Sequence, residues 1–365
     1  MQDKAAKVAV IIGTRAQMIK MAPVLQALDK YGLKYWFLHT GQHSDTFDDL
    51  RKEFNIRSPD TVAAGANETN TLGRLFKWIG SAITETLLAK RRLLPVRKGV
   101  VLVHGDTLST IWGALLGRFT GNKVIHVEGG LRSKRLLHPF PEELVRRLTG
   151  ILATHHACPG EESVNNLGGI SENVRSTEGN TLVDAVAYAL ISGDAPEQIP
   201  DRPYAIASIH RAETLYNRHR LQRAIQILES LAEARLILVV GHPSLLARLK
   251  NLGLISQLED HRDIEIIPRM PYTPFINLLA NANLLATDGG SNQEESSYLG
   301  LPTLILREAT ERPEGIGSNA TLIGLSVEKA KYYSEHFKVL KKQHQTQNFR
   351  PSEIIAEWTN ELIEN

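Results

Sequence analysis

The sequence contains little of what several classes of protein require. Its 365 residues include one cysteine, Cys158, which excludes an intramolecular disulfide framework and a cysteine-based zinc site. Lysine and arginine total 42 against 40 acidic residues, and the resulting net charge of +2 gives no strong field for nucleic acid or an anionic membrane. No apolar run approaches the roughly 20 residues that span a bilayer. We therefore expect a cytoplasmic protein that binds neither nucleic acid nor membrane.

Two common nucleotide-binding fingerprints are also missing. The first predicted strand runs into Gly13-Thr-Arg15, which lacks the G-x-G-x-x-G pattern, and no G-x-x-x-x-G-K-[ST] segment occurs. His126-Val-Glu128 imitates the H-x-E of zinc deaminases, yet no P-C-x-x-C follows it. His155 and His156 are neighbours on a predicted strand, so they face opposite sides and cannot share a metal. The sequence thus predicts no cofactor and no metal ion.

Short apolar runs alternate with helical patterns along the whole chain. Because these runs are continuous rather than alternating, they predict strands covered on both faces, and therefore parallel sheets with helices between them. The predicted strands are Val8–Ile12, Tyr35–His39, Gly99–His104, Lys123–Val127, Ala153–Cys158, Tyr204–Ser208, Arg235–Val240, Asp263–Ile267, Leu284–Thr287 and Thr303–Leu306. The predicted helices are Met18–Lys30, Leu108–Phe119, Glu142–Ile151, Leu221–Glu233, Pro274–Ala280 and one that runs from the glycines after Asp288 to Gly300.

The length and the patterns divide the chain into two α/β halves. A chain of this length exceeds what one hydrophobic core usually supports. The best hinge candidate is the region 179–187 together with the segment 192–203, whose proline, glycine and acidic residues disfavour a strand or a helix.

The segment Asp288-Gly-Gly-Ser-Asn-Gln-Glu-Glu295 carries the densest chemical signal. It follows a predicted buried strand and opens a predicted helix, so several backbone N–H groups lack helical partners and suit a phosphate. Glu294 and Glu295, one turn further on, can accept hydrogen bonds from sugar hydroxyls. These features indicate a nucleotide site, although an ordinary strand-to-helix connection uses the same glycines and acids.

Most other polar clusters also follow predicted strands. Because ligands bind beyond the carboxyl ends of parallel strands, we expect these side chains at one edge of each sheet. Each has a structural alternative, such as a helix cap for Asp106 or an i, i+4 pair between Glu142 and Arg146. The clusters are Gly13-Thr-Arg15 with Lys20, His104-Gly-Asp106-Thr107, Glu128-Gly-Gly-Leu-Arg132, Pro139-Phe-Pro-Glu142-Glu143 with Arg146 and Arg147, His210-Arg211-Ala-Glu213, and Asp288.

These motifs resemble, in order, the non-hydrolysing UDP-N-acetylglucosamine 2-epimerases over residues 7–325. Further segments that carry the resemblance are Gly179-Asn-Thr181 and Glu311-Arg-Pro-Glu314. The resemblance implies an α/β fold with two Rossmann-like domains whose parallel sheets face a central cleft, as in the glycosyltransferase-B-like fold. It implies one domain at 1–180 with a returning C-terminal helix at 348–365, which carries the acid/base residues, and a UDP-binding domain at 181–347. Pro351–Glu364 would be that helix.

The resemblance also implies a reaction. UDP is eliminated to give a 2-acetamidoglucal, C2 is reprotonated from the other face, and UDP adds back. Asp106, Glu128 and Glu142 match the acid/base positions, with their assignment to faces open, and His210 matches the residue that meets the departing diphosphate. A cytoplasmic homodimer acting in polysaccharide biosynthesis is expected. The predicted substrate-binding residues are Arg15, Lys20, Arg132, Arg146, Arg211, Phe275, Gly289, Gly290, Ser291 and Glu295.

Several positions depart from the family pattern. Ala16-Gln17 stands where Pro-Glu is usual, Gly129 stands where Ala is usual, and the serine of the phosphate segment has moved to Ser291. Residues 64–71 lack the glutamine of members that a second UDP-sugar activates, although Gln42-His43 is kept. These departures leave the exact sugar and the activation by a second UDP-sugar open.

Three alternatives stay open beside the non-hydrolysing epimerase. A glycosyltransferase of the same fold would need only one base and a pocket for an acceptor, and a UDP-sugar sensor would not need the acids. A hydrolysing epimerase would release free N-acetylmannosamine. The three carboxylates in the first half favour an epimerase over a transferase or a sensor.

Overall fold

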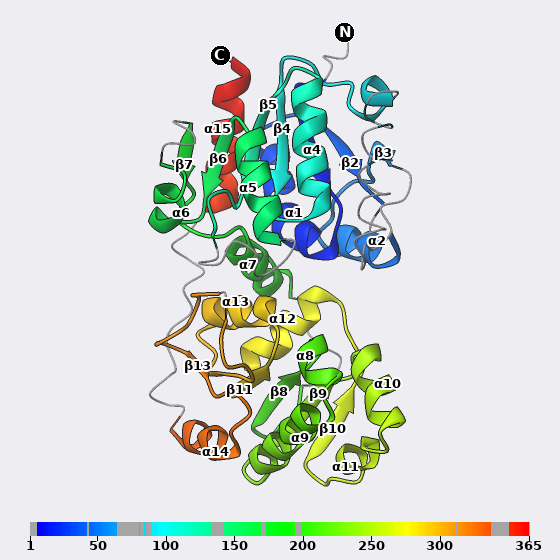
Figure 1. The fold of residues 1–365 in the computed structure, drawn as a ribbon, viewed down its shortest axis with the longest axis vertical. Helices are drawn as coiled ribbons and strands as arrows, with labels where there is room; N and C mark the ends of the chain where they lie inside the picture. Colours follow the sequence, from blue (N-terminus) through cyan, green and yellow to red (C-terminus); the bar gives the residue numbers. More distant parts are fainter. Residues whose placement is uncertain are drawn as a thin grey trace. The chain divides into compact units, whose positions relative to one another are not determined.

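The computed structural model describes residues 6–41, 44–63, 80, 84, 86, 89–132, 142–168, 173–193, 199–310, 312–336 and 350–364. The chain forms two compact units, Met1–Ala185 with Phe349–Asn365, and Val186–Asn348 (Figure 1). Each unit is built on a parallel sheet with helices, which confirms the predicted α/β class. Within the described ranges, no helix is both long and apolar enough to cross a membrane.

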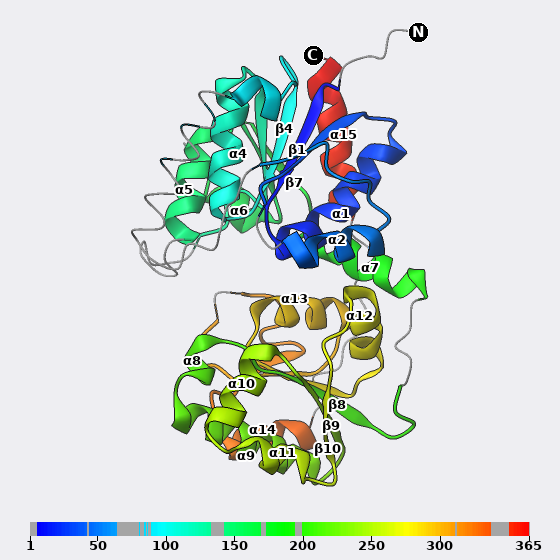
Figure 2. The same ribbon diagram turned by 90° about the vertical axis from the view of Figure 1, so that its right-hand side faces the viewer.

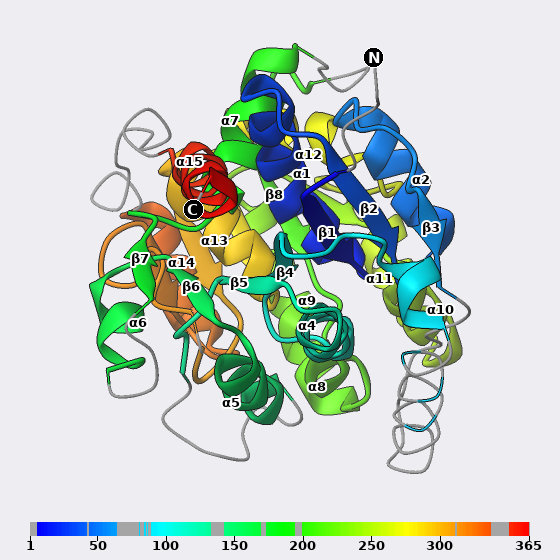
Figure 3. The same ribbon diagram turned by 90° about the horizontal axis from the view of Figure 1, so that it is seen from above.

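The first unit contains a seven-stranded parallel sheet in the order β3-β2-β1-β4-β5-β6-β7. Helices α4 (Leu108–Phe119) and α5 (Glu142–Leu152) cover one face, and α1 (Arg15–Lys30) and α15 (Pro351–Glu364) cover the other (Figures 2 and 3). Two short helices are α2 (Ser44–Glu53) and α6 (Glu161–Asn165). The strands are β1 (Val8–Ile12), β2 (Tyr35–His39), β3 (Thr61–Val62), β4 (Val100–His104), β5 (Lys123–Val127), β6 (His155–Cys158) and β7 (Val174–Ser176).

The second unit contains a six-stranded parallel sheet in the order β10-β9-β8-β11-β12-β13. Its strands are β8 (Tyr204–Ser208), β9 (Leu236–Val240), β10 (Ile264–Ile267), β11 (Leu284–Thr287), β12 (Thr303–Ile305) and β13 (Ala320–Leu322). Its helices are α8 (Ala212–Leu215), α9 (Arg218–Ala232), α10 (Pro243–Asn251), α11 (Ile255–Glu259), α12 (Tyr272–Asn281), α13 (Gly290–Leu299) and α14 (Val327–Glu335). Strands β8, β9 and β11 are buried along their whole length, as their continuous apolar runs predict.

Both sheets reverse their strand order at one point. The reversal lies between β1 and β4 in the first unit and between β8 and β11 in the second. Ligands of open parallel sheets bind beyond the carboxyl ends of the strands at such a point. The loops that follow these four strands begin at Gly13, Gly105, Ile209 and Asp288, and they hold Asp106, His210, Arg211 and Gly289 of the predicted site.

The prediction that residues 179–187 form no helix is wrong. Helix α7 runs over Leu182–Ser192, and the boundary between the two compact units lies within it. Its sequence, LVDAVAYALIS, is apolar nearly all round and contains neither proline nor glycine, which first follow at Gly193. Helix α1 begins at Arg15 rather than Met18, because Thr14 accepts a hydrogen bond from Gln17 N and caps the first turn.

Helix α15 packs against α1 in the first unit. Lys30 Nζ lies 2.5 Å from Glu353 Oε1, and Tyr31 donates its hydroxyl hydrogen to Glu357. At the other end Arg175 donates to both oxygens of Glu361, at 3.0 and 2.6 Å. These exposed pairs align the helix but contribute little to its stability, because solvent screens them.

Asp184 connects α7 to the first turn of α15, since its Oδ2 accepts a hydrogen bond of 2.8 Å from Ser352 N. Burial raises the pKa of Asp184 to about 6, and the hydrogen bond from Ser352 opposes that shift. A carboxyl whose pKa is raised by folding binds its proton more tightly in the folded state. Its contribution to stability therefore grows as the pH falls from about 6 towards 4, and its ionised form lowers stability above that window.

We expect Asp184→Asn to stabilise the protein at pH 8 by about 1–2 kcal/mol, because the amide keeps an acceptor for Ser352 N without a buried charge. Near pH 4 the substitution should have little effect. Urea unfolding at both pH values measures this, with Asp201→Asn on the exposed surface as the matched control. An equal change at both pH values would contradict the assignment.

Candidate active site

Gln17 organises the loops that follow β1 and β4. Its Oε1 accepts hydrogen bonds from Gly13 N and Thr14 N, at 2.8 and 3.1 Å. Its Nε2 donates to His104 O, at 2.7 Å, and to the hydroxyls of Thr107 and Thr110. A glutamate at this position would have no donor for these three acceptors unless it were protonated. Glutamine therefore ties the two loops together as a neutral residue.

Glu128 follows β5 in the left-handed region, with φ of 62°. Its side chain is 7% exposed and pairs with Lys20, whose Nζ lies 2.6 Å from Oε1. Asn180 also donates a hydrogen bond to Oε1, and His104 Nε2 lies 3.4 Å from Oε2. Left-handed backbone at a glutamate costs on the order of 1 kcal/mol or more, so local contacts hold this residue in place.

Asp106 follows β4 and pairs with Arg146 of α5, with 2.5 Å between Oδ2 and Nη2. Arg146 also approaches Glu143, at 3.7 Å, and Arg147 Nε donates to Glu143 at 2.9 Å. The structure thus brings Asp106 and Arg146 together, and Arg146 pairs with Glu143 rather than with Glu142 at i, i+4. Glu142, the first residue of α5, is half-buried, and its Oε2 has no hydrogen-bond partner among the described residues.

The histidines of β5 and β6 support the turn at Glu128. Burial lowers the pKa of His126 to about 4 and that of His156 to about 3, so both rings are neutral at pH 7. His126 Nε2 bonds to Gly105 O at 2.7 Å. A Cβ added at Gly129 would lie 3.1 Å from the Cβ of His156, so an alanine at this position would crowd His156.

His155 faces the other side of β6 from His156. Its ring meets Trp358 of α15 edge-on, with 5.5 Å between the centroids, whereas His156 lies near His126. The predicted opposite orientation of the two histidines is confirmed. No group of three or more histidine, cysteine, aspartate or glutamate residues within the described ranges is arranged to hold a metal ion.

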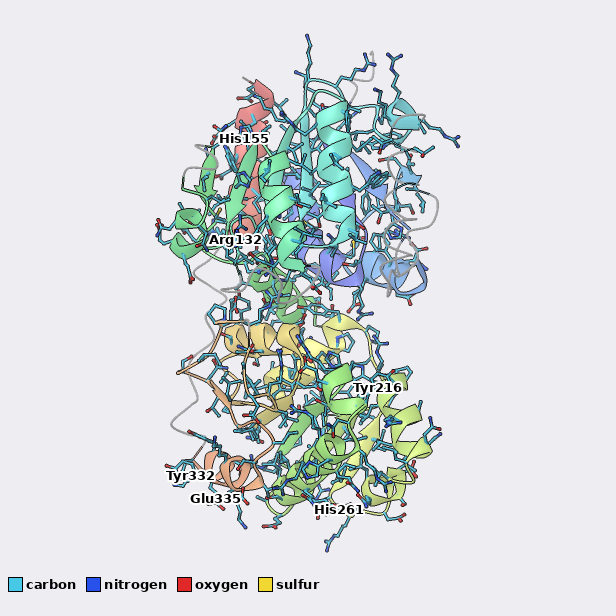
Figure 4. All side chains as sticks on the ribbon, viewed as in Figure 1. Arg132, His155, Tyr216, His261, Tyr332 and Glu335 are labelled. Atoms are coloured by element: carbon cyan, nitrogen blue, oxygen red, sulfur yellow. The ribbon has the colours of Figure 1, made fainter. Side chains whose placement is uncertain are left out.

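Arg132 lies beyond the carboxyl end of β5, whereas His155 lies at the amino end of β6 beside α15 (Figure 4). Burial lowers the pKa of Arg132, and Glu143 opposes the shift, while Arg147 and Arg146 add to it. Arg132 therefore stands with the charged residues of α5. Arg15, the first residue of α1, is half-buried and lies close to the carboxyl end of β1, where the strand order reverses.

In the second unit, Asp288 joins the ends of β8 and β11. Its Oδ1 and Oδ2 accept hydrogen bonds from His210 N, at 3.0 Å, and Arg211 N, at 3.1 Å. Burial is the main cause that lowers the pKa of His210, and the charge of Asp288 opposes it. A Cβ added at Gly289 would lie 2.6 Å from His210 Cε1. Glycine at 289 is therefore required for this placement of the imidazole.

Helix α13 starts next to two arginines. Its first N–H groups have no acceptor within the helix, as at any helix start. Gly289 N donates a hydrogen bond of 2.9 Å to Thr287 Oγ1, and this N–H group is therefore already used. The next two N–H groups along the helix belong to Gly290 and Ser291. A Cβ added at Gly290 would lie 3.5 Å from Arg211 Nη2 and from Arg312 Cγ. The helix start and two guanidinium side chains together form a cationic surface suited to a phosphate.

The two acids of α13 have different partners. Arg312 Nη1 lies 2.5 Å from Glu294 Oε1, and the side chain of Glu294 is 1% exposed. Glu294 is thus paired with Arg312 in this structure. Glu295 is buried and accepts a hydrogen bond of 2.9 Å from Asn292. Phe275 lies on α12 and is half-buried.

The family model described as UDP-N-acetylglucosamine 2-epimerase matches residues 26–354. The chain belongs to this family. It is 33% identical over 334 residues to the UDP-N-acetylglucosamine 2-epimerase of Methanocaldococcus jannaschii, with 87% of this chain and 88% of the relative covered. It is 32% identical to the enzyme of that name from Bacillus subtilis, over 86% of this chain and 82% of the relative.

Solved structures of the family share the fold. The UDP-GlcNAc 2-epimerase of M. jannaschii superposes with a TM-score of 0.80 at 30% identity, over 97% of this chain and 99% of that one. The Neisseria meningitidis epimerase bound to UDP-GlcNAc gives 0.80 at 27% identity, with 97% and 99% covered. Acinetobacter baumannii MurG, at 13% identity and a TM-score of 0.57, shares the fold alone. The predicted family and two-domain fold are confirmed.

Three residues outside the predicted set contact candidate site residues, and these are Asn180, Arg312 and His242. Asn180 stands in the Gly179-Asn-Thr181 motif and contacts Glu128, and Arg312 stands in the Glu311-Arg-Pro-Glu314 motif and borders α13. His242 follows β9, and its ring lies 4.8 Å from that of His210. Asn180 and Arg312 stand in motifs that carry the family resemblance, so those motifs could have identified them.

Proposed function

We propose that the chain inverts C2 of UDP-N-acetylglucosamine to give UDP-N-acetylmannosamine, or inverts C2 of a closely related UDP-acetamido sugar. Membership of the epimerase family supports this, and two solved relatives are described as bound to UDP-GlcNAc. The observation that carries the proposal is the pair of carboxylate–cation contacts, Glu128 with Lys20 and Asp106 with Arg146, beyond the carboxyl ends of neighbouring strands.

The proposed reaction removes the C2 proton and expels UDP. The electron pair of the C2–H bond forms a C1=C2 double bond, and the pair of the C1–O bond leaves with the diphosphate, giving a 2-acetamidoglucal. C2 is then reprotonated from the opposite face while UDP adds back to C1. Asp106, Glu128 and Glu142 are the acid/base candidates, because inversion needs proton transfer on both faces.

The second unit is proposed to hold the leaving group. The N–H groups of Gly290 and Ser291, with Arg211 and Arg312, suit the diphosphate, whose charge grows as the C1–O bond breaks. Glu295 is proposed to accept from the ribose hydroxyls. In this proposal the acid/base domain comprises 1–180 with 348–365, and the UDP-binding domain comprises 181–347. Arg15, Lys20, Arg132, Arg146, His210, Phe275 and Gly289 complete the proposed site.

Glycosyltransferase activity is the weaker hypothesis, because the matching family model describes epimerases and the named relatives are epimerases. The proposal further includes a cytoplasmic homodimer that serves polysaccharide biosynthesis. Light scattering of the purified protein measures its oligomeric state.

Incubation with UDP-N-acetylglucosamine in heavy water tests the function. We expect deuterium to appear at C2 of the product, because the proton that returns comes from an acid that exchanges with solvent. Proton NMR follows the loss of the C2 signal and the appearance of the manno product, with Glu128→Gln as the inactive control. Product that carries only the original hydrogen at C2 would exclude the elimination route.

A further inference from the structure

Asn180 holds a fixed orientation between β7 and α7. It is 4% exposed, and its Oδ1 accepts a hydrogen bond of 3.0 Å from Leu182 N, at the first residue of α7. Only the oxygen of an amide can accept from a backbone N–H. The amide nitrogen therefore faces the other way and donates to Glu128 Oε1.

Glu128 Oε1 consequently receives two donors, Asn180 Nδ2 and Lys20 Nζ, the latter at 2.6 Å. A carboxylate oxygen has two lone pairs, and two donors occupy both. Oε1 cannot take up a proton without losing one of these bonds. Proton transfer is thereby directed to Oε2, which lies 3.4 Å from His104 Nε2. Gly105 adds no side chain on that side, where a Cβ would stand 3.6 Å from Oε2.

The charged and titratable groups around Glu128 come from several elements. Lys20 belongs to α1, His104 ends β4, and His126 belongs to β5 and interacts electrostatically with Glu128. Burial lowers the pKa of His126 to about 4, so its ring is neutral near pH 7. Lys20 and Asn180 both favour the ionised carboxylate, one by its charge and the other by its hydrogen bond.

We propose that Asn180 is a positioning residue that keeps Glu128 ionised at rest and directs its proton chemistry to Oε2. Glu128 is then the base, rather than the acid, in the first step. Its Oε2 takes the C2 proton, the C2–H electron pair becomes the C1=C2 double bond, and the C1–O pair leaves with UDP. The inference rests on the proposed function and adds to it a role for Asn180 and an acting atom for Glu128.

Two substitutions separate the contacts of Asn180. Asn180→Asp keeps an oxygen that accepts from Leu182 N, but it replaces the donor to Glu128 by a second carboxylate. We expect its kcat at pH 7 to fall about 10²-fold or more, with a smaller change in KM. Asn180→Ala loses both contacts, and its acid-side limb of kcat/KM should move upward by about one pH unit. Asn281→Asp, on the exposed surface of α12, is the control for an added charge.

The decisive readouts are the pH profile and a 13C NMR titration of the Glu128 carboxyl, assigned with Glu128→Gln. An upward shift of the acid limb and of the NMR midpoint in Asn180→Ala supports the inference. The inference is overturned if the acid limb and the NMR midpoint of Asn180→Ala both stay at their wild-type pH values. Asn180 would then have a purely structural role at the start of α7, even if kcat and thermal stability fall together. If the wild type does not epimerise, the proposed function fails, and the NMR midpoint alone still decides the role of Asn180.

Discussion

Glu128→Gln is expected to lower kcat by at least about 10²-fold, the usual loss when a general acid or base is removed. Glutamine keeps the size of the side chain and an oxygen that can accept from Lys20 and Asn180, but it cannot exchange a proton at C2. UDP affinity should stay near that of the wild type, because the proposed diphosphate contacts lie in the second unit. Initial rates by coupled assay and calorimetric titration with UDP measure the two quantities.

The same loss is expected for Asp106→Asn and Glu142→Gln, since inversion needs acid/base groups on two faces. Glu361→Gln makes the same chemical change at an exposed ion pair in the first unit and should leave kcat unaltered. Weak effects at Asp106, Glu128 and Glu142 would remove the catalytic assignment. Unfolded variants would indicate instead that these acids serve the fold.

Arg312→Met is expected to weaken UDP binding by about 10–100-fold, the loss of one charge-assisted hydrogen bond to a phosphate. It should also lower the free energy of unfolding by about 3 kcal/mol, because Glu294, with a side chain 1% exposed, loses its cation. Titration with UDP and with pyrophosphate should show similar losses, since the proposed contact is with the diphosphate.

The double variant Arg312→Met, Glu294→Gln separates the two roles. Without the buried charge of Glu294, stability should recover, whereas UDP affinity should remain low. Arg202→Met removes an arginine from an exposed ion pair in the same unit and should leave UDP affinity and stability close to those of the wild type. If UDP affinity recovers in the double variant, Arg312 acts on the fold of the segment and not on the diphosphate.

The sequence predicts those parts of the fold that rest on continuous apolar runs. Central strands such as β1 and β8 are buried at every position, and their short continuous apolar runs, rather than a period, distinguish them from the longer helices. Edge strands β3, β7 and β13 contain only two or three residues, too few to carry a period. Helix α7 was missed because its apolar residues lie beside a segment rich in proline and glycine.

The candidate site is predictable as a set of positions but not as a set of contacts. Polar residues after strands locate the sheet edge, because parallel strands all end on the same side. The partner of each charge depends on distances between elements far apart in the chain. Arg146 could pair with Glu142 on its own helix, yet it reaches Asp106 after β4. Asn180 lies 52 residues from Glu128 in sequence, and no local pattern connects them.

The ion pair between Lys20 and Glu128 also constrains how this sequence can drift. Both side chains are 7% exposed, so a chain that loses the carboxylate keeps a buried ammonium without this counter-charge, at a cost on the order of 3 kcal/mol. That loss is a large share of the stability of a typical domain. A mutation at either position alone is therefore removed by selection for folding, even where the activity is dispensable. A descendant that no longer catalyses the reaction must change both positions nearly together. Glu128 is therefore retained for stability even after its catalytic role is lost.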